Sequence, residues 1–168
     1  MFLHEWAMMK EQNFDIEIKA DGRWFHEGGE IKRMGLVKLF ASVLSCDEAG
    51  DYWLTTPVEK GRIQVEDSAF IITSLRLEGT GREAKLYVMD NLEAEHLVSE
   101  KTPLALCVSP QDGEVKPYIL LEKNLTARLL RPVFYELADI ALSQDESGEW
   151  LYSDGHAFSL SAPNEELK

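Results

Sequence analysis

Residues 31–60 constrain the fold most, because they join an amphipathic helix to a turn and a strand. Apolar side chains recur there at helical spacing and form one stripe, made of Leu36, Val37, Phe40, Val43 and Leu44. An acidic turn ending in Gly50 follows, since acidic side chains bond to nearby backbone and glycine tolerates positive φ. Residues 52–55 then have the aromatic and β-branched character of a strand. The segment therefore predicts a helix beside a β-sheet.

A fainter copy of this segment follows near the C-terminal end. When Gly50 is aligned with Gly148, six further positions are identical: Arg33 and Arg131, Leu39 and Leu137, Leu44 and Leu142, Ser45 and Ser143, Asp47 and Asp145, Glu48 and Glu146. Both copies also predict the same order of elements, namely strand, Asp-Gly turn, strand, helix, acidic turn, strand, turn and strand. Chance is the alternative for so few identities, but the shared order favours internal duplication.

The predicted fold class is α+β, with two similar units related by duplication. Each unit is a mostly antiparallel β-sheet packed on one main helix. We place the N-terminal ββαββ unit, with an N-terminal arm, at residues 1–68. Residues 69–168 form the C-terminal unit, which contains a hairpin and linker at 69–98 and the second ββαββ copy.

The second helical segment contains a proline. Proline lacks a backbone N–H and clashes with the preceding helical turn, so Pro132 cannot lie in the middle of a helix. We therefore predict a short helix at residues 126–130 and a longer helix that has Pro132 in its first turn, where proline is tolerated.

The charge of the chain limits the classes of partner. With 30 acidic and 17 basic residues, the net charge of -13 opposes nucleic acid and anionic membranes, which need clustered Lys and Arg. A small anion in a local basic pocket stays compatible with this balance. No apolar run approaches the roughly 20 residues of a membrane span, and the first residues lack the features of a signal peptide. Cys46 and Cys107 are predicted to be buried thiols, and a cytoplasmic location is expected.

No sequence motif indicates a metal, a cofactor or a catalytic nucleophile. The four histidines share no metal-ligand spacing with one another or with the cysteines. The Gly-x-Ser-x-Gly and phosphate-loop patterns are missing. We therefore predict no cofactor, no metal site and no catalytic residue.

A polar cluster directly after a predicted strand supplies most of the candidate ligand-binding residues. Thr56, Glu59 and Lys60 can form a solvated turn with an ordinary Glu–Lys pair. Alternatively, Arg33, Lys60 and the Thr56 hydroxyl face an anionic group, since Arg offers a planar fork and Lys a point charge. Arg33 and Arg131 can instead pair with the acidic turns of the two units. The candidate residues are Arg33, Thr56, Glu59, Lys60 and Arg131.

Three stretches carry a resemblance to a known family: IKRMGLVKLFASVL, DYWLTTPVEK and IQVEDSAF. Through them, residues 16–160 resemble a bacterial family catalogued as domain of unknown function 1285. The chain departs from the expected pattern at Gly35, where relatives should carry an acidic residue, and at Ser68, where they should carry alanine. The resemblance implies a two-unit α+β fold with internal repeats and a role in signal transduction. It supplies no catalytic residue.

We predict a non-catalytic module that binds a small anionic ligand or a protein partner. Exposed aromatic or edge-strand surfaces are expected to make it a homo-oligomer. The alternative is a small hydrolase or isomerase that uses Glu59 or Glu66 as a general acid–base in a cleft. The adjacent carboxylates of Glu66 and Asp67 are otherwise expected to be solvated in a turn.

Overall fold

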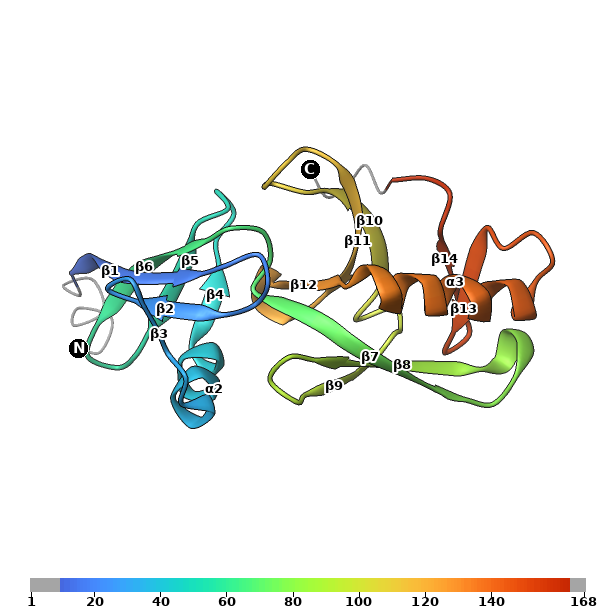
Figure 1. Cartoon of the computed structure of the whole chain (residues 1–168), viewed down its shortest axis with the longest axis horizontal. Coiled ribbons are helices and arrows are strands. Elements are labelled where there is room, and N and C mark those ends of the chain that lie inside the picture. Colours follow the sequence, from blue (N-terminus) through green and yellow to red (C-terminus); the bar gives the residue numbers. More distant parts are fainter. Residues whose placement is uncertain (1–9, 164–168) are drawn as a thin grey trace, which may run out of the picture. The chain divides into compact units, whose positions relative to one another are not determined.

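The computed structural model describes residues 10–163, which form two compact units. Unit 1 ends at Glu66 and unit 2 begins at Asp67 (Figure 1). The boundary predicted from the sequence lies two residues later, between residues 68 and 69. Each unit contains a six-stranded sheet, and each holds one α-helix among the described residues. The prediction of an α+β chain with two sheet-rich units is therefore confirmed.

Unit 1 is built on sheet A, in which the strands lie in the order β3-β2-β1-β6-β5-β4. Its elements are β1 (Glu11–Ile18), β2 (Trp24–His26), β3 (Gly29–Glu30), α2 (Met34–Ser42), β4 (Leu44–Cys46), β5 (Tyr52–Thr55) and β6 (Lys60–Val65). The pairing of β1 with β6 is parallel, whereas the other pairings are antiparallel. The first and last strands of the unit, β1 and β6, therefore lie side by side at the centre of the sheet.

Helix α2 is shorter than the sequence predicted. It ends at Ser42, and Leu44–Cys46 form a strand paired with β5 instead of the last helical turn. The expected stripe is only partly buried, since Val37 is buried whereas Phe40 is half-buried. Phe40 stacks on the buried Trp24 ring with 6.3 Å between ring centroids, which joins α2 to sheet A.

The acidic turn after β4 is organised by the Asp47 carboxylate. Asp47 Oδ1 accepts hydrogen bonds from the backbone N–H groups of Ala49 (3.0 Å) and Asp51 (2.9 Å). Its Oδ2 accepts one from the Trp53 indole N–H at 2.8 Å. The hydrogen bond from the Trp53 indole does most to lower the pKa of Asp47, and the two backbone hydrogen bonds lower it further, because donors favour the charged form of the carboxylate.

Unit 2 is built on sheet B, in the order β10-β11-β12-β7-β8-β9. Its strands are β7 (Phe70–Glu78), β8 (Lys85–Asp90), β9 (Glu95–Leu97), β10 (Leu104–Val108), β11 (Val115–Leu120) and β12 (Thr126–Leu129). Helix α3 (Arg131–Gln144) follows, and β13 (Trp150–Ser153) pairs with β14 (His156–Ser159) in a separate two-stranded sheet. The predicted hairpin after residue 68 is confirmed as β7 and β8, and β7 also pairs in parallel with β12.

The short helix predicted at residues 126–130 is wrong. Residues Thr126–Leu129 form β12, which pairs with β11 on one side and with β7 on the other. The side chains of Ala127 and Leu129 are buried on one face, in the alternation of a strand. Pairing to two neighbours thus overrides local helical preference. The second part of the prediction is confirmed, because Pro132 lies in the first turn of α3.

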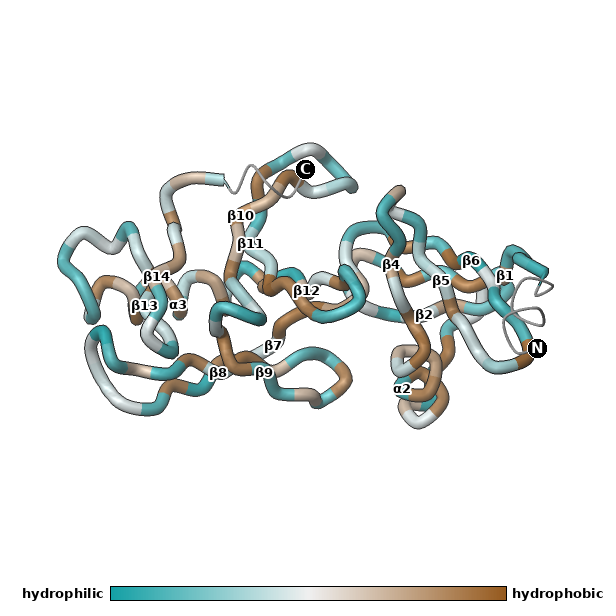
Figure 2. The backbone as a smooth tube through the Cα atoms, turned by 180° about the vertical axis from the view of Figure 1, so that it is seen from behind, coloured by the Kyte–Doolittle hydropathy of each residue, from teal (hydrophilic) through white to brown (hydrophobic). Residues whose placement is uncertain are grey.

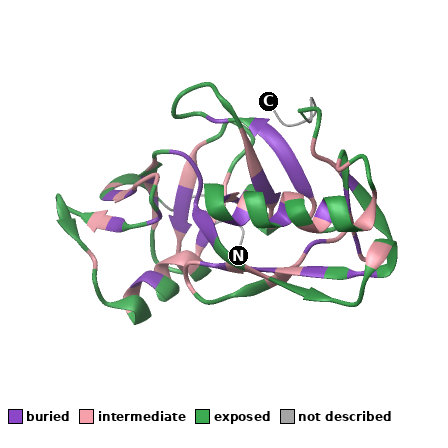
Figure 3. Ribbon diagram, turned by 45° about the vertical axis from the view of Figure 1, so that its right-hand side comes forward, coloured by how far each residue is buried: buried purple, intermediate pink, exposed green. Residues whose placement is uncertain are grey.

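Helix α3 has one buried and one exposed face (Figure 3). Val133, Leu137 and Ala141 recur every four residues and are buried, as expected for an amphipathic helix. The helix contacts β7 and β13. Hydrophobic residues also lie within strands such as β8 and β10, while many connecting turns are hydrophilic (Figure 2). None of the helices in the described residues is long and apolar enough to span a membrane.

The two acidic turns share one backbone hydrogen bond and a glycine with positive φ. Gly50 N–H donates to the Asp47 carbonyl (3.1 Å), and Gly148 N–H donates to the Asp145 carbonyl (3.0 Å). Both glycines have positive φ, which accounts for glycine at each position. The strands after the turns differ, because β5 and β6 belong to sheet A whereas β13 and β14 form their own sheet. Internal duplication stays a prediction.

We predict that Gly61→Ala destabilises unit 1 by about 1–3 kcal/mol. Gly61 is buried in β6, and a Cβ there would lie 2.1 Å from the Phe14 ring, so the ring would have to move. Gly35→Ala is the control, because a Cβ in this α2 position meets nothing within 4 Å. Denaturant unfolding should separate the two, and a wild-type midpoint for Gly61→Ala would contradict the packing described.

We also predict that the stability difference between wild type and Asp47→Asn depends on pH. The pKa of Asp47 is lowered from 3.8 in the folded chain, so its stabilisation is present above that value. The stabilisation is lost as the pH falls from about 3.8 through the lower folded pKa. Thermal unfolding between pH 7 and pH 2.5 should show the two curves converging in acid. A constant difference would rule out the charge of Asp47 as its origin.

Candidate anion-binding site

Three of the residues predicted from the sequence form a turn in unit 1. The Thr56 hydroxyl lies 3.2 Å from both the backbone N–H and the carbonyl of Glu59, so it is used inside the turn. The Lys60 ammonium lies 4.5 Å from the centre of the Trp53 ring and 3.7 Å from a Glu11 carboxylate oxygen. The Thr56 and Lys60 side chains and the Glu59 backbone thus have the contacts expected of an ordinary turn and strand end.

Arg33 is not joined to that turn. It is the residue before α2 and is exposed. Among residues 10–163, no hydrogen bond or ion pair links Arg33 to Thr56, Glu59 or Lys60. The anionic pocket predicted from Arg33, Thr56 and Lys60 stays a prediction without a contact that supports it.

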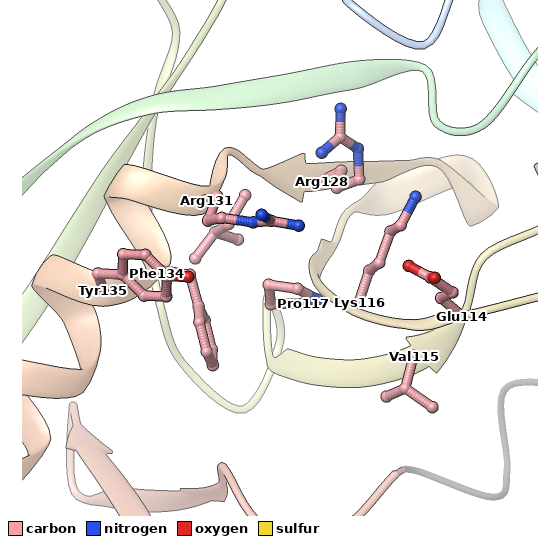
Figure 4. Close-up of a pocket in the computed structure, with 9 residues that line it drawn as sticks. Glu114, Val115, Lys116, Pro117, Arg128, Arg131, Phe134 and Tyr135 are labelled. Atoms are coloured by element: carbon pink, nitrogen blue, oxygen red, sulfur yellow. The ribbon is translucent and has the colours of Figure 1, made fainter. Parts of the chain in front are cut away.

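Arg131 lies beside a cavity in unit 2. The cavity has a volume of about 210 Å³ and opens at the surface where α3 begins. Two further cations line it, Lys116 from β11 and Arg128 from β12 (Figure 4). Phe134 and Tyr135 from the first turns of α3 also line it, together with Glu114, Val115, Pro117 and Leu129. Strand pairing between β11 and β12 and the helix that follows β12 therefore bring the three cations together.

This cavity is locally basic in an acidic unit. From Asp67 onward the sequence has nine Lys or Arg and eighteen Asp or Glu residues, and three of the nine cations line the cavity. One acidic side chain, Glu114, lines it as well. The Lys116 ammonium donates a hydrogen bond to Asp112 Oδ2 at 2.7 Å, and this bond lowers the pKa of the Asp112 carboxyl. Arg131 is exposed and forms no ion pair within residues 10–163.

A buried carboxylate, Asp67, lies next to the cavity residue Arg128. The Asp67 side chain is fully buried, and its Oδ1 accepts hydrogen bonds from Ser109 (2.8 Å) and the Tyr118 hydroxyl (2.7 Å). Arg128 Nε lies 2.8 Å from Oδ2, in an ion pair that lacks the angle of a hydrogen bond. Burial above all raises the pKa of Tyr118 well above its ordinary value, so the hydroxyl keeps its proton.

The backbone of the same region is also fixed by hydrogen bonds. The Ser68 hydroxyl donates to the Phe70 carbonyl at 2.6 Å and accepts from the Arg128 N–H at 3.3 Å. Side-chain and backbone contacts thus position Arg128 from two sides. One residue of the cavity lining is therefore positioned by contacts within the protein itself.

The expectation of a solvated carboxylate at Asp67 is wrong, and its partners were missed. Ser109 and Tyr118 lie 42 and 51 residues away from Asp67 in the sequence, so no local spacing reveals the contact. Tyr118 looks like one more apolar residue of a strand. The signal that was present is the Asp67-Ser68 pair inside a stretch that resembles the family.

The arrangement suits an anion that carries an apolar group. Arg and Lys bind carboxylate or phosphate oxygens, and aromatic side chains cover apolar atoms. The volume is below the roughly 300–1,000 Å³ usual for small-molecule sites, so the bound group must be small. Within the described part of the chain, no three His, Cys, Asp or Glu side chains gather in a way that could hold a metal ion.

Comparison with known families gives two matches that together span most of the chain. Residues 2–68 match the domain described as "Domain of unknown function (DUF1285), N-terminal domain". Residues 69–160 match the domain described as "Protein of unknown function (DUF1285), C-terminal domain". A search of the curated proteins gave no match.

Two crystal structures of DUF1285 family proteins are similar to this chain. The protein from Silicibacter pomeroyi DSS-3 is 33% identical with a TM-score of 0.80, over 95% of this chain and 86% of that chain. The protein from Shewanella baltica OS155 is 29% identical with a TM-score of 0.58, over 75% of this chain and 91% of that chain. The similarity therefore extends over both units for the first of them.

We predict that Tyr118→Phe lowers the free energy of unfolding by about 1.5–3 kcal/mol, which is the usual contribution of a hydrogen bond to a charged group. The variant keeps the ring and removes only the hydroxyl that donates to Asp67. Tyr135→Phe is the matched control, because Tyr135 is exposed and its substitution should stay within about 0.5 kcal/mol. Urea unfolding at pH 7 measures both. Equal midpoints for the two variants would show that the Tyr118 bond adds no stability.

Proposed function

Because the chain belongs to the DUF1285 family, whose function is unknown, we propose from its own site that unit 2 is a ligand-binding module. In this proposal, the cavity beside α3 holds the anionic group of a ligand, and the aromatic residues cover its apolar part. The observation that carries the proposal is that Lys116, Arg128 and Arg131 all line one small cavity.

The three cations have different parts in this proposal. Arg128 and Lys116 are each paired with a carboxylate, Asp67 and Asp112 respectively, so their positions are set before binding. Arg131 lacks an ion-pair partner within residues 10–163 and is therefore the charge most available to a ligand. The Arg131 side chain points from the start of α3 in the direction of Lys116 (Figure 4). Arg131 should consequently contribute most to affinity for an anion.

We propose binding without catalysis. The two carboxylates considered as general acid–bases, Glu59 and Glu66, are exposed. Glu66 accepts a hydrogen bond from the Ala20 N–H at 2.6 Å, and Glu59 lies in the turn closed by Thr56. Catalytic carboxylates are typically found in clefts that shift their pKa, so this exposure favours binding.

The remaining predictions from the sequence are kept as proposals. A cytoplasmic location is supported by Cys46 and Cys107, which are both free thiols. A role in signal transduction rests only on the family resemblance. Self-association is proposed because aromatic side chains such as Tyr135 are exposed. Duplication of a unit with one main helix per sheet is supported by the backbone hydrogen bond and the positive-φ glycine that the two acidic turns share.

We predict that small aromatic acids stabilise the protein through Arg131. Phenylacetate and phenyl phosphate should raise the melting temperature more than acetate or inorganic phosphate, because Phe134 and Tyr135 can cover the ring. At a ligand concentration near ten times Kd, the stabilisation should be about 1.4 kcal/mol. A thermal-shift titration at fixed ionic strength measures it.

Two variants make this test specific. Arg131→Gln should remove at least half of the shift, because it removes the available charge. Lys101→Gln should leave the shift unchanged, because Lys101 is an exposed residue of the same unit that does not line the cavity. If no acid stabilises the wild type, or if both variants respond alike, the proposed function is wrong.

A further inference from the structure

The surface beside the cavity exposes large apolar side chains. Tyr135 is 60% exposed and Val115 is 50% exposed, although both line the cavity. Val108 is 54% exposed and is the cross-strand partner of Val115 at the end of β10 and β11. Directly paired residues share one face of an antiparallel sheet, so the apolar surface continues from the cavity onto the hairpin.

A small cavity with exposed apolar residues around it differs from an enclosed small-molecule site. The cavity is too small for most such ligands, yet the apolar residues that would cover a ligand extend past its rim. Contiguous exposed apolar side chains next to polar ones mark contacts with other proteins. A cavity of this size holds one side chain of a peptide, while the rest of the peptide lies on the surface around the cavity.

Charge determines which peptide fits. Arg131 lines the cavity together with Tyr135, and Tyr and Arg are among the residue types that contribute most at protein interfaces. A peptide that covers Val115 and Tyr135 therefore brings its neighbouring side chains close to Arg131. Carboxylates match this cation, whereas Lys or Arg in the peptide would be repelled.

We propose that the natural occupant of this site is an acidic–apolar peptide segment of a partner protein. The carboxylate of one Asp or Glu enters the cavity toward Arg131, and a flanking large apolar side chain lies against Phe134 and Tyr135. This inference rests on the proposed function, because it assigns the anionic group of the ligand to a peptide carboxylate.

The experiment is selection of random heptapeptides displayed on phage, with the full chain as the immobilised protein. Selected peptides should combine Phe, Trp or Leu with Asp or Glu, and fluorescence anisotropy should measure their affinity. Arg131→Glu should weaken binding at least tenfold, and Tyr135→Ala should weaken it several-fold. Added salt should weaken it too.

Matched controls separate the site from general effects of charge or hydrophobicity. Lys101→Glu makes the same change of sign as Arg131→Glu at an exposed position of unit 2 outside the cavity lining. Leu39→Ala removes an apolar side chain that is 61% exposed on α2 in unit 1. Both variants should bind the selected peptides like wild type, and circular dichroism should confirm that all four variants are folded.

The outcomes distinguish this inference from the proposed function. Enrichment of no peptide, or peptides that bind wild type and Arg131→Glu equally, overturns the inference. If phenylacetate or phenyl phosphate still stabilises the chain through Arg131, the anion site stands and only the peptide is wrong. If the small acids also fail, the anion site is wrong as well.

Discussion

The buried Asp67 carboxylate is the interaction on which unit 2 depends most. A charge removed from water is strongly destabilising unless it is paired and hydrogen-bonded. Asp67 meets this requirement through Ser109, Tyr118 and Arg128, which come from the end of β10, from β11 and from β12. One side chain thus joins the first residue of unit 2 to three neighbouring segments of sheet B. The unit has to assemble these contacts together, because each partner alone leaves the carboxylate incompletely satisfied.

The same contacts connect the stability of unit 2 to its proposed binding site. Arg128 is the ion-pair partner of Asp67 and also lines the cavity. Lys116 is held in a comparable way by Asp112, in the turn between β10 and β11. Two of the three cations are therefore fixed by carboxylates that do not line the cavity. A site arranged in this way loses little conformational entropy on binding, since long basic side chains are ordered beforehand.

Local and overall charge have opposite signs in this protein. The chain has a net charge of -13, which excludes broad attraction to polyanions. Salt screens charges that are more than roughly 8–10 Å apart. Acidic residues farther than this from the cavity therefore repel an approaching acid only weakly. Near the cavity, Lys116, Arg128 and Arg131 dominate instead. This local charge is why we propose a small acidic group as the ligand despite the acidic chain.

The sequence alone determined the class of fold, the hairpin after residue 68 and the helix starting near Pro132, and it singled out Arg131, which lines the candidate cavity. These follow from local rules, since alternation, turn chemistry and the missing N–H of proline act within a few residues. The tertiary structure decided that residues 126–129 form a strand and that Asp67 is buried. It also placed Lys116 and Arg128 beside Arg131. Those outcomes depend on pairing between segments distant in the sequence, whose energy exceeds local preference and leaves no spacing pattern to recognise.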